Sequence, residues 1–210
     1  ARPRVHARLA CATADGGVHV SVHLMLGRSA ASSSAPPAPV ALHAGLERMM
    51  AEYNPKDPSE RFFGGHRWNG LMAGIAWQMQ QDINPCGDFV SVRWSTGCGG
   101  WAGVPWIVIG DPSQSTQHGL YLSYLFCADM SAVYLCLGQG GTKLKKAFGQ
   151  TVARRYMDEV AGFARRRCAE VLSNDADGAG GIDFAGTIDL RTNGALAKMY
   201  MDGSIVSRRY

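Results

Sequence analysis

The fold class is decided by residues 89–137, which read FVSVRWSTGCGGWAGVPWIVIGDPSQSTQHGLYLSYLFCADMSAVYLCL. Apolar and β-branched residues in this stretch form four short segments, at 89–94, 104–109, 120–126 and 132–137. The segments are separated by connectors rich in Gly, Ser, Asp and Pro, which are typical of turns. Because the connectors are too short for helical crossovers, the stretch predicts an antiparallel meander.

Helical spacing flanks the predicted sheet on both sides. Apolar residues recur at helical intervals over 40–53 and 69–83, and each pattern stops at an Asn-Pro pair. A longer amphipathic helix is predicted over 150–172, with an apolar stripe of Val152, Tyr156, Val160, Phe163, Ala164, Cys168 and Val171. Residues 182–188 and 194–201 predict two more short strands or a hairpin. The order of elements indicates an α+β fold, with a curved, mainly antiparallel sheet packed against helices.

The first part of the chain differs in composition from the rest. Residues 2–8 are basic, residues 18–26 alternate between apolar and polar positions as in a half-buried strand, and residues 29–39 form a Ser/Ala/Pro stretch typical of a linker. We therefore predict an N-terminal extension or linker over 1–39 and one compact domain over 40–210. Residues 1–39 are either native structure or an added segment.

The composition excludes several classes of protein. Hydrophobic residues make up 46% of the 210 residues and charged residues 18%, which suits a globular core rather than a disordered chain. The net charge of +4 excludes a strongly basic, histone-like protein. The six cysteines contain no C-x-x-C pair, so we expect reduced thiols and a cytoplasmic protein. The sequence contains no run of 18 apolar residues, so it predicts no membrane span.

Signatures of catalysis are absent from the sequence, which has no G-x-S-x-G, H-E-x-x-H or G-x-x-x-x-G-K-[ST] motif. We therefore expect no cofactor, no metal site and no catalysis in this domain. One alternative is a nucleic-acid-processing enzyme that uses the Cys98 thiol, or Asp183 and Asp189 with a metal ion. Another is an interaction module whose tryptophan-rich segment 92–106 binds a peptide.

The predicted strand at 120–126 has two faces. Leu120, Leu122, Tyr124 and Phe126 alternate with Tyr121, Ser123 and Leu125. The first set is a complete core face by itself. The second set is then expected to face solvent or a cavity, where apolar side chains favour a binding surface.

The segment 97–106, GCGGWAGVPW, resembles the core motif of the N-terminal DNA-binding domain family of McrB, which recognises methylated DNA in modification-dependent restriction. The resemblance continues through an apolar strand, the triplet Gly119-Leu120-Tyr121 and a strand at 133–137, and it covers about residues 40–200. It implies a domain that flips a modified base out of duplex DNA into an aromatic pocket. Nuclease activity would then reside elsewhere, in a nuclease or AAA+ module in cis or in trans.

Site residues follow from the resemblance one at a time. Tyr121 matches the wedge that enters the gap in the duplex, while Trp106 and Leu125 match pocket walls, with Ser123 beside them. Cys98 stands where the methylcytosine reader has a pocket tyrosine, so Trp101 or Trp94 is expected to replace the lost ring. The resemblance therefore predicts recognition of 5-methylcytosine, 5-hydroxymethylcytosine or N6-methyladenine.

Basic residues are concentrated after the predicted meander. Residues 141–170 hold eight Lys and Arg against three Asp and Glu, a net +5, whereas residues 85–140 hold one against three, a net −2. Cations beside a nearly neutral sheet suit phosphate contacts. The expected phosphate-binding residues are Arg93, Lys143, Lys145, Lys146, Arg154 and Arg155.

Overall fold

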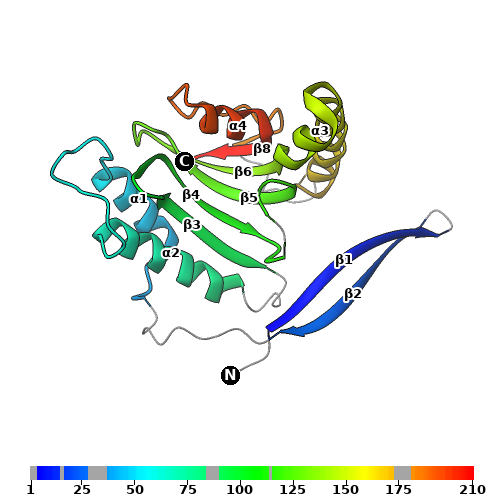
Figure 1. The fold of residues 1–210 in the computed structure, drawn as a ribbon, viewed down its shortest axis with the longest axis horizontal. Coiled ribbons are helices and arrows are strands. Elements are labelled where there is room, and N and C mark those ends of the chain that lie inside the picture. Colours follow the sequence, from blue (N-terminus) through cyan, green and yellow to red (C-terminus); the bar gives the residue numbers. More distant parts are fainter. Residues whose placement is uncertain (1–3, 15–16, 28–36, 84–89, 114, 173–180) are drawn as a thin grey trace.

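A computed structural model describes residues 4–14, 17–27, 37–83, 90–113, 115–172 and 181–210. Six strands form one sheet in the order β3-β4-β5-β6-β8-β7, and every neighbouring pair is antiparallel (Figure 1). The described residues also form helices before and between the strands of this sheet. The predicted α+β fold with an antiparallel sheet is therefore confirmed. The predicted start of the first strand at residue 89 lies outside the described residues.

The four predicted segments are the first four strands of this sheet, which lie side by side from the edge strand inward. They are β3 (Ser91–Gly97), β4 (Trp101–Gly110), β5 (Gly119–Phe126) and β6 (Val133–Gly140). The register pairs Trp106 with Leu125 and Val108 with Ser123 across β4 and β5. Since side chains alternate between the two faces of a strand, these four residues share one face of the sheet.

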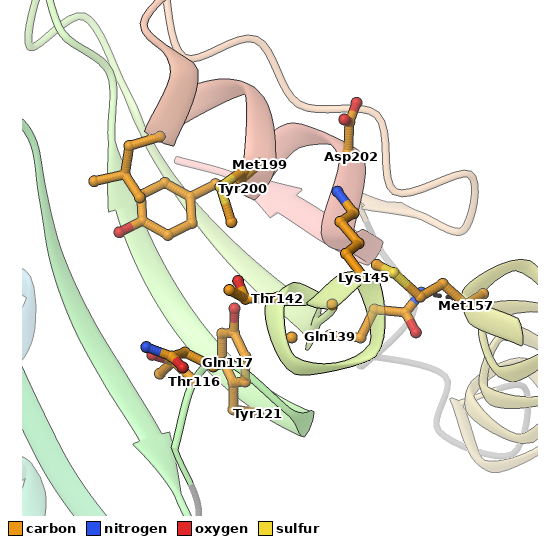
Figure 2. A pocket seen from close by; sticks show the side chains of 13 residues that line it. Thr116, Gln117, Tyr121, Gln139, Thr142, Lys145, Met157, Met199, Tyr200 and Asp202 are labelled. Atoms are coloured by element: carbon orange, nitrogen blue, oxygen red, sulfur yellow. Dashed lines mark hydrogen bonds between the residues drawn. The ribbon is translucent and has the colours of Figure 1, made fainter. Parts of the chain in front are cut away.

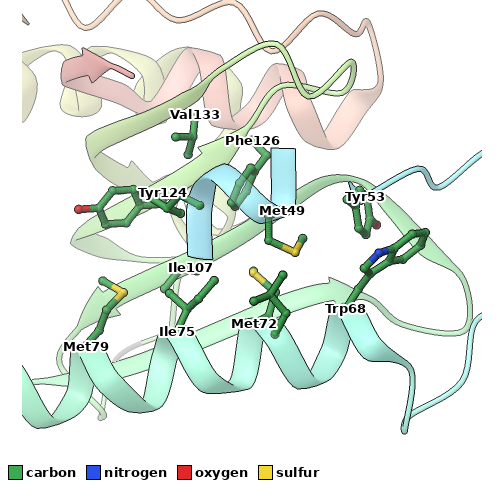
Figure 3. Close-up of a cluster of buried hydrophobic side chains, with 12 residues drawn as sticks. Met49, Tyr53, Trp68, Met72, Ile75, Met79, Ile107, Tyr124, Phe126 and Val133 are labelled. Atoms are coloured by element: carbon green, nitrogen blue, oxygen red, sulfur yellow. The ribbon is translucent and has the colours of Figure 1, made fainter. Parts of the chain in front are cut away.

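The opposite face of the sheet is covered by α1 (Leu42–Glu52) and α2 (Arg67–Ile83). Figure 3 shows their methionines and Trp68 packed against strand residues such as Ile107 and Phe126. Met49, Trp68, Met72, Ile75, Ile107 and Phe126 are all fully buried there. These helices therefore form the main hydrophobic core, which leaves the other face of the sheet available for a different use.

The helix pair covers only part of β5. Tyr124 and Phe126 are buried against it, as the alternation predicts, but Leu120 and Leu122 are 45% and 41% exposed. The prediction of a core face along the whole strand is wrong at this end. The main core, including its partly buried residues, does not extend to Leu120 or Leu122, so these two side chains stay accessible.

The long helix α3 (Thr142–Leu172) is broken at Gly149, whose φ of 78° and ψ of 166° are not helical. Its second part therefore begins where the sequence predicts a helix, at residue 150. The predicted stripe is wrong at Val152, Tyr156, Phe163 and Val171, which are 48–63% exposed, but it is right at Ala164, which is buried. Ala153, Met157 and Ala161, which the stripe did not include, complete the buried face.

The C-terminal tail also differs from the prediction. Strand β7 (Ile182–Asp183) is present, but residues 194–201 do not form a strand. They belong to helix α4 (Ala195–Gly203), which leads directly into the last strand, β8 (Ser204–Arg209). The helix buries Ala197 against the face of the sheet that α1 and α2 leave open. Alanine, leucine, methionine and lysine in this segment are good helix formers, and this propensity was overlooked.

Strands β1 (Arg4–Ala14) and β2 (Gly17–Gly27) pair antiparallel in a separate two-stranded sheet. The predicted strand at 18–26 is thus present as β2. Most of the predicted linker at 29–39, and the break at 173–180, lie outside the described residues.

Candidate functional site

The face of the sheet opposite α1 and α2 contains a small cavity. Its floor is formed by Trp106 and Val108 of β4 and by Tyr121, Ser123 and Leu125 of β5. The register that pairs these two strands brings the side chains side by side. The predicted set of Tyr121, Ser123 and Leu125 therefore lies on one face and lines one cavity together with Trp106.

Two further residues cover this floor. Tyr200 of α4 and Thr116 of the β4–β5 loop complete the lining of the cavity. The enclosed volume is about 20 Å³, which is room for one water molecule. The cavity of the free protein is thus nearly closed, and anything larger requires Tyr200 or Thr116 to move.

The β4–β5 loop is held over the sheet by its contact with Gly140. A Cβ atom at residue 140 would lie 2.3 Å from the His118 nitrogen and 2.4 Å from the Thr116 oxygen. The Lys143 amide also donates a hydrogen bond to the Gln117 oxygen at 3.2 Å. Only glycine permits this approach, which fixes Thr116 above the cavity.

Tyr121 lies in the wall between this cavity and a larger chamber. Its ring rests beside Gly138, where an added Cβ would come within 3.4 Å of Cε2. Burial raises the pKa of Tyr121 to about 12, and burial also raises the pKa of Tyr200. Both hydroxyls are therefore neutral at physiological pH and able to donate hydrogen bonds.

The chamber on the other side of Tyr121 has a volume of about 340 Å³ (Figure 2). Its walls come from the β4–β5 loop, the ends of β5 and β6, the start of α3 and helix α4. It shares Thr116, Tyr121 and Tyr200 with the small cavity. The two spaces are therefore adjacent and share these three residues as walls.

Three residues predicted for the pocket lie elsewhere. Cys98 is exposed in the turn between β3 and β4 and lines neither space. Trp101 packs in the aromatic cluster next to α2, where its ring centroid lies 4.8 Å from that of Trp68. Trp94 packs against the same helix-side core. The structure does not bring these three residues to the cavity, so neither tryptophan supplies a ring there.

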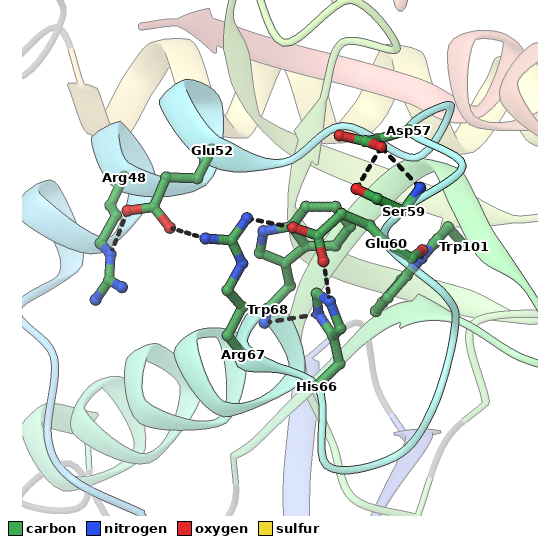
Figure 4. A network of polar contacts seen from close by, with 9 residues as sticks. All are labelled: Arg48, Glu52, Asp57, Ser59, Glu60, His66, Arg67, Trp68 and Trp101. Atoms are coloured by element: carbon green, nitrogen blue, oxygen red, sulfur yellow. Dashed lines mark hydrogen bonds and ion pairs between the residues drawn. The ribbon is translucent and has the colours of Figure 1, made fainter.

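Trp101 belongs to a polar and aromatic network on the helix side (Figure 4). Its indole nitrogen donates to the backbone oxygen of Glu60 at 2.5 Å. The Glu60 carboxylate contacts His66 Nε2 at 2.5 Å and the Arg67 guanidinium at 2.5 Å. These contacts hold Trp101 in place on the helix side. The structure thus explains this residue of segment 97–106 without a ligand.

The predicted cations fall into two groups. Lys143, Lys146, Arg154 and Arg155 are exposed on α3, and none of them forms an ion pair with another described residue. Lys145 is half-buried and lines the chamber. Arg93 is half-buried on β3, next to Val108 of the cavity floor, and its Nε has no hydrogen-bond partner among the described residues.

The carboxylates considered for metal binding are engaged locally. Asp183 accepts hydrogen bonds from the backbone amides of Ala185 and Thr187, both at 2.8 Å. Asp189 accepts one from the Arg191 amide at 2.9 Å and pairs with the Arg191 guanidinium at 3.2 Å. Within the described part of the chain, no three His, Cys, Asp or Glu residues are grouped to hold a metal ion.

Tyr200 and Thr116 are the site residues that sequence reasoning missed. Tyr200 lies in a segment read as a strand, although Leu196, Met199 and Tyr200 follow helical spacing and all line the chamber. Thr116 lies in a polar loop that carries no comparable signal.

Over the described residues, no helix is both long and apolar enough to pass through a bilayer.

Comparison with known proteins identifies a family. No curated protein matches the chain. The sequence pattern of the MrcB-like N-terminal domain covers residues 48–210, well over half of the chain, and these residues contain the sheet, the cavity and α3. The chain therefore belongs to the MrcB-like N-terminal domain family.

Proposed function

We propose that this domain recognises a modified base in duplex DNA, by holding the base in the cavity on the open face of the sheet after it has rotated out of the duplex. Membership of the family indicates a DNA-binding domain. The observation that carries the proposal is the convergence of Trp106, Tyr121, Ser123 and Leu125 on one cavity, which Tyr200 and Thr116 cover.

The chemistry of the cavity suits a neutral, planar ligand. Trp106 and Leu125 offer apolar surface against which a base can stack, and the Ser123 hydroxyl offers hydrogen bonding. Burial also raises the pKa of Cys136, which lies beside Ser123 in the register, to about 12, so its thiol is neutral. The floor thus holds no ion that a bound base would have to desolvate.

The closed cavity implies a cost that binding must offset. Unstacking and unpairing a base costs a few kcal/mol, and displacing Tyr200 or Thr116 adds to this. Stacking on an aromatic side chain returns about 1–3 kcal/mol per base. Since Tyr121 forms a wall of the cavity, its placement favours a role in holding the base over the role of a wedge in the duplex.

The proposed ligands are 5-methylcytosine and 5-hydroxymethylcytosine, with N6-methyladenine as a purine alternative. A buried methyl group contributes only about 0.8 kcal/mol, so discrimination depends on hydrogen bonds as well as on added apolar area. We further propose that the domain is not itself catalytic. It would direct a nuclease or AAA+ module, in cis or in trans, to modified DNA in the cytoplasm.

The test is a competition between matched duplexes that differ at one base. Fluorescence anisotropy with 5-methyl, 5-hydroxymethyl and plain cytosine duplexes is expected to show tighter binding of modified DNA. Trp106→Ala should weaken binding of the modified duplex by about 5- to 150-fold, the equivalent of 1–3 kcal/mol of lost stacking, and bring it toward the affinity for plain duplex, which still binds.

Trp106→Phe keeps an aromatic ring in the cavity and is the matched control. It should recover part of the preference that Trp106→Ala loses. Equal binding of modified and plain duplexes by the unmutated domain would overturn the proposal, as would cleavage of DNA by the domain alone with Mg²⁺ or Mn²⁺.

A further inference from the structure

We propose that the 340 Å³ chamber beside the base cavity receives the substituent of the modified base, and that the domain accepts cytosine whose 5-hydroxymethyl group carries a sugar. This inference rests on the proposed function, because it places the base in the neighbouring cavity. It goes beyond it by naming a bulky, uncharged, hydroxyl-rich substituent as the preferred class.

The first argument is position. The small cavity and the chamber share Thr116, Tyr121 and Tyr200 in their walls. A base is larger than the small cavity, so its binding would require side chains of this lining to shift, and a shift of a shared wall would join the two spaces. A group attached to the bound base can then extend into the chamber without displacing the backbone.

The second argument is size. A volume of about 340 Å³ lies within the range of small-ligand sites, which begins near 300 Å³. A methyl or hydroxymethyl group would leave most of this space to water. A hexose linked to the hydroxymethyl oxygen would fill a much larger share and displace more of that water.

The third argument is the chemistry of the walls. Gln117 and the hydroxyls of Thr116 and Thr142 supply neutral donors and acceptors, while Tyr121 and Tyr200 supply aromatic surface beside them (Figure 2). A hydroxyl group both donates and accepts, so a sugar can pair with any of these groups. Aromatic faces also pack well against the C–H surfaces of a sugar ring.

Charge decides against an ionic substituent. The chamber is lined by one cation, Lys145, and one anion, Asp202, which lie on the same side of it (Figure 2). These opposite charges leave no net preference for a phosphate or an amine, yet both can hydrogen-bond to hydroxyl groups. A neutral polyhydroxyl group suits this pair better than either kind of ion.

The experiment compares four duplexes that carry plain, 5-methyl, 5-hydroxymethyl or glucosylated 5-hydroxymethyl cytosine at one position. Binding of each fluorescently labelled duplex to the whole domain is measured by anisotropy. Met199→Trp places a large ring over the chamber from a position that is 41% exposed and outside the small cavity. Ala195→Trp adds the same ring at an exposed position of α4 that does not line the chamber.

We expect the unmutated domain to bind the glucosylated duplex at least as tightly as the hydroxymethyl duplex. Met199→Trp should weaken binding of the glucosylated duplex by 10-fold or more, and should change binding of the methyl and hydroxymethyl duplexes by less than 2-fold. Ala195→Trp should change none of them. Asp202→Ala, which removes a polar group without filling space, should weaken only the glucosylated duplex.

The outcomes separate the two proposals. If no modified duplex binds better than plain cytosine, the proposed function fails. If the methyl and hydroxymethyl duplexes bind better than plain DNA but the glucosylated duplex binds worse, the chamber proposal alone is overturned. If Met199→Trp weakens all modified duplexes alike, the chamber holds the base itself and the assignment of a substituent site is wrong.

Discussion

Glu60 shows at the scale of single residues how the helix side of the sheet is fastened. Its carboxylate bridges His66 and Arg67, and its backbone oxygen accepts the Trp101 indole N–H. The Trp68 amide donates to His66 Nδ1 at 3.3 Å, so Nε2 carries the proton that faces Glu60. Glu60 therefore connects the loop before α2 to the start of β4.

The Glu60 carboxyl gives this network a defined pH dependence. The hydrogen bond from His66 is the main cause that lowers its pKa below the ordinary 4.5, and the Arg67 charge adds to it. A lowered pKa in the folded state contributes stability above about pH 4.5, and this contribution is lost as the pH falls through the folded-state pKa. We expect Glu60→Gln to be less stable than the unmutated domain at pH 7, with the difference shrinking toward pH 3.

Urea midpoints at pH 7, 5 and 3 check this expectation. Glu47→Gln, at an exposed glutamate that is paired with His43 on α1, is the control and should stay within about 0.5 kcal/mol of the unmutated domain. A Glu60→Gln difference that is independent of pH would show that the carboxylate charge does not contribute.

At the scale of elements, α3 packs through its small residues. Ala161 and Ala164 are buried against Ile205 and Val206 of β8, whereas Phe163 is 61% exposed. Arg165 reinforces this contact by donating from Nε to the Ile205 oxygen at 3.0 Å. The alanines allow the helix to approach the edge of the sheet closely.

This packing predicts opposite effects at neighbouring positions. Ala164→Leu should destabilise the domain by about 1–3 kcal/mol through overpacking. Phe163→Ala should leave the free energy of unfolding within about 0.5 kcal/mol of the original value. Urea denaturation of the two variants tests the register of the helix, because the stripe expected from hydrophobicity alone buries Phe163 as well and requires Phe163→Ala to be destabilising.

The same contrast shows what sequence patterns can predict in this chain. Period-two alternation located β5 and grouped Tyr121, Ser123 and Leu125 correctly on one face, because side-chain direction along a strand is a local property. The stripe on α3 was wrong at four positions because the tertiary partner of a helix selects which face is buried. Tyr200 and Thr116 reach the cavity through long-range packing, which no local pattern encodes.

Trp106 and Trp101 show the same limit of local patterns within the candidate site. Both lie in one glycine-rich motif, yet Trp106 lines the cavity and Trp101 packs on the helix side. Spacing within a strand distinguishes even from odd positions. It does not tell which face a helix will cover and which will stay open to a ligand.

At the scale of the whole molecule, charge and the apolar cavity are separated. The exposed cations Lys143, Lys146, Arg154 and Arg155 lie on α3, and Thr142 at the start of that helix lines the chamber next to the cavity. The cavity floor itself is uncharged. This arrangement suits a division of labour in which α3 binds phosphates and the sheet selects the base.

The double variant Lys143→Ala with Lys146→Ala tests this division. If both side chains contact phosphates, the slope of log K against log salt should fall by about 0.9 per lost contact, and modified and plain duplexes should weaken alike. Arg48→Ala with Lys56→Ala removes the same charge from α1 and the loop that follows it and is the matched control, for which the slope should not change. Lys145 is left intact because it lines the chamber, so its loss would mix the two effects. If the preference for modified DNA falls together with the slope, α3 takes part in reading the base. If the two double variants have equal slopes, the phosphate contacts lie elsewhere.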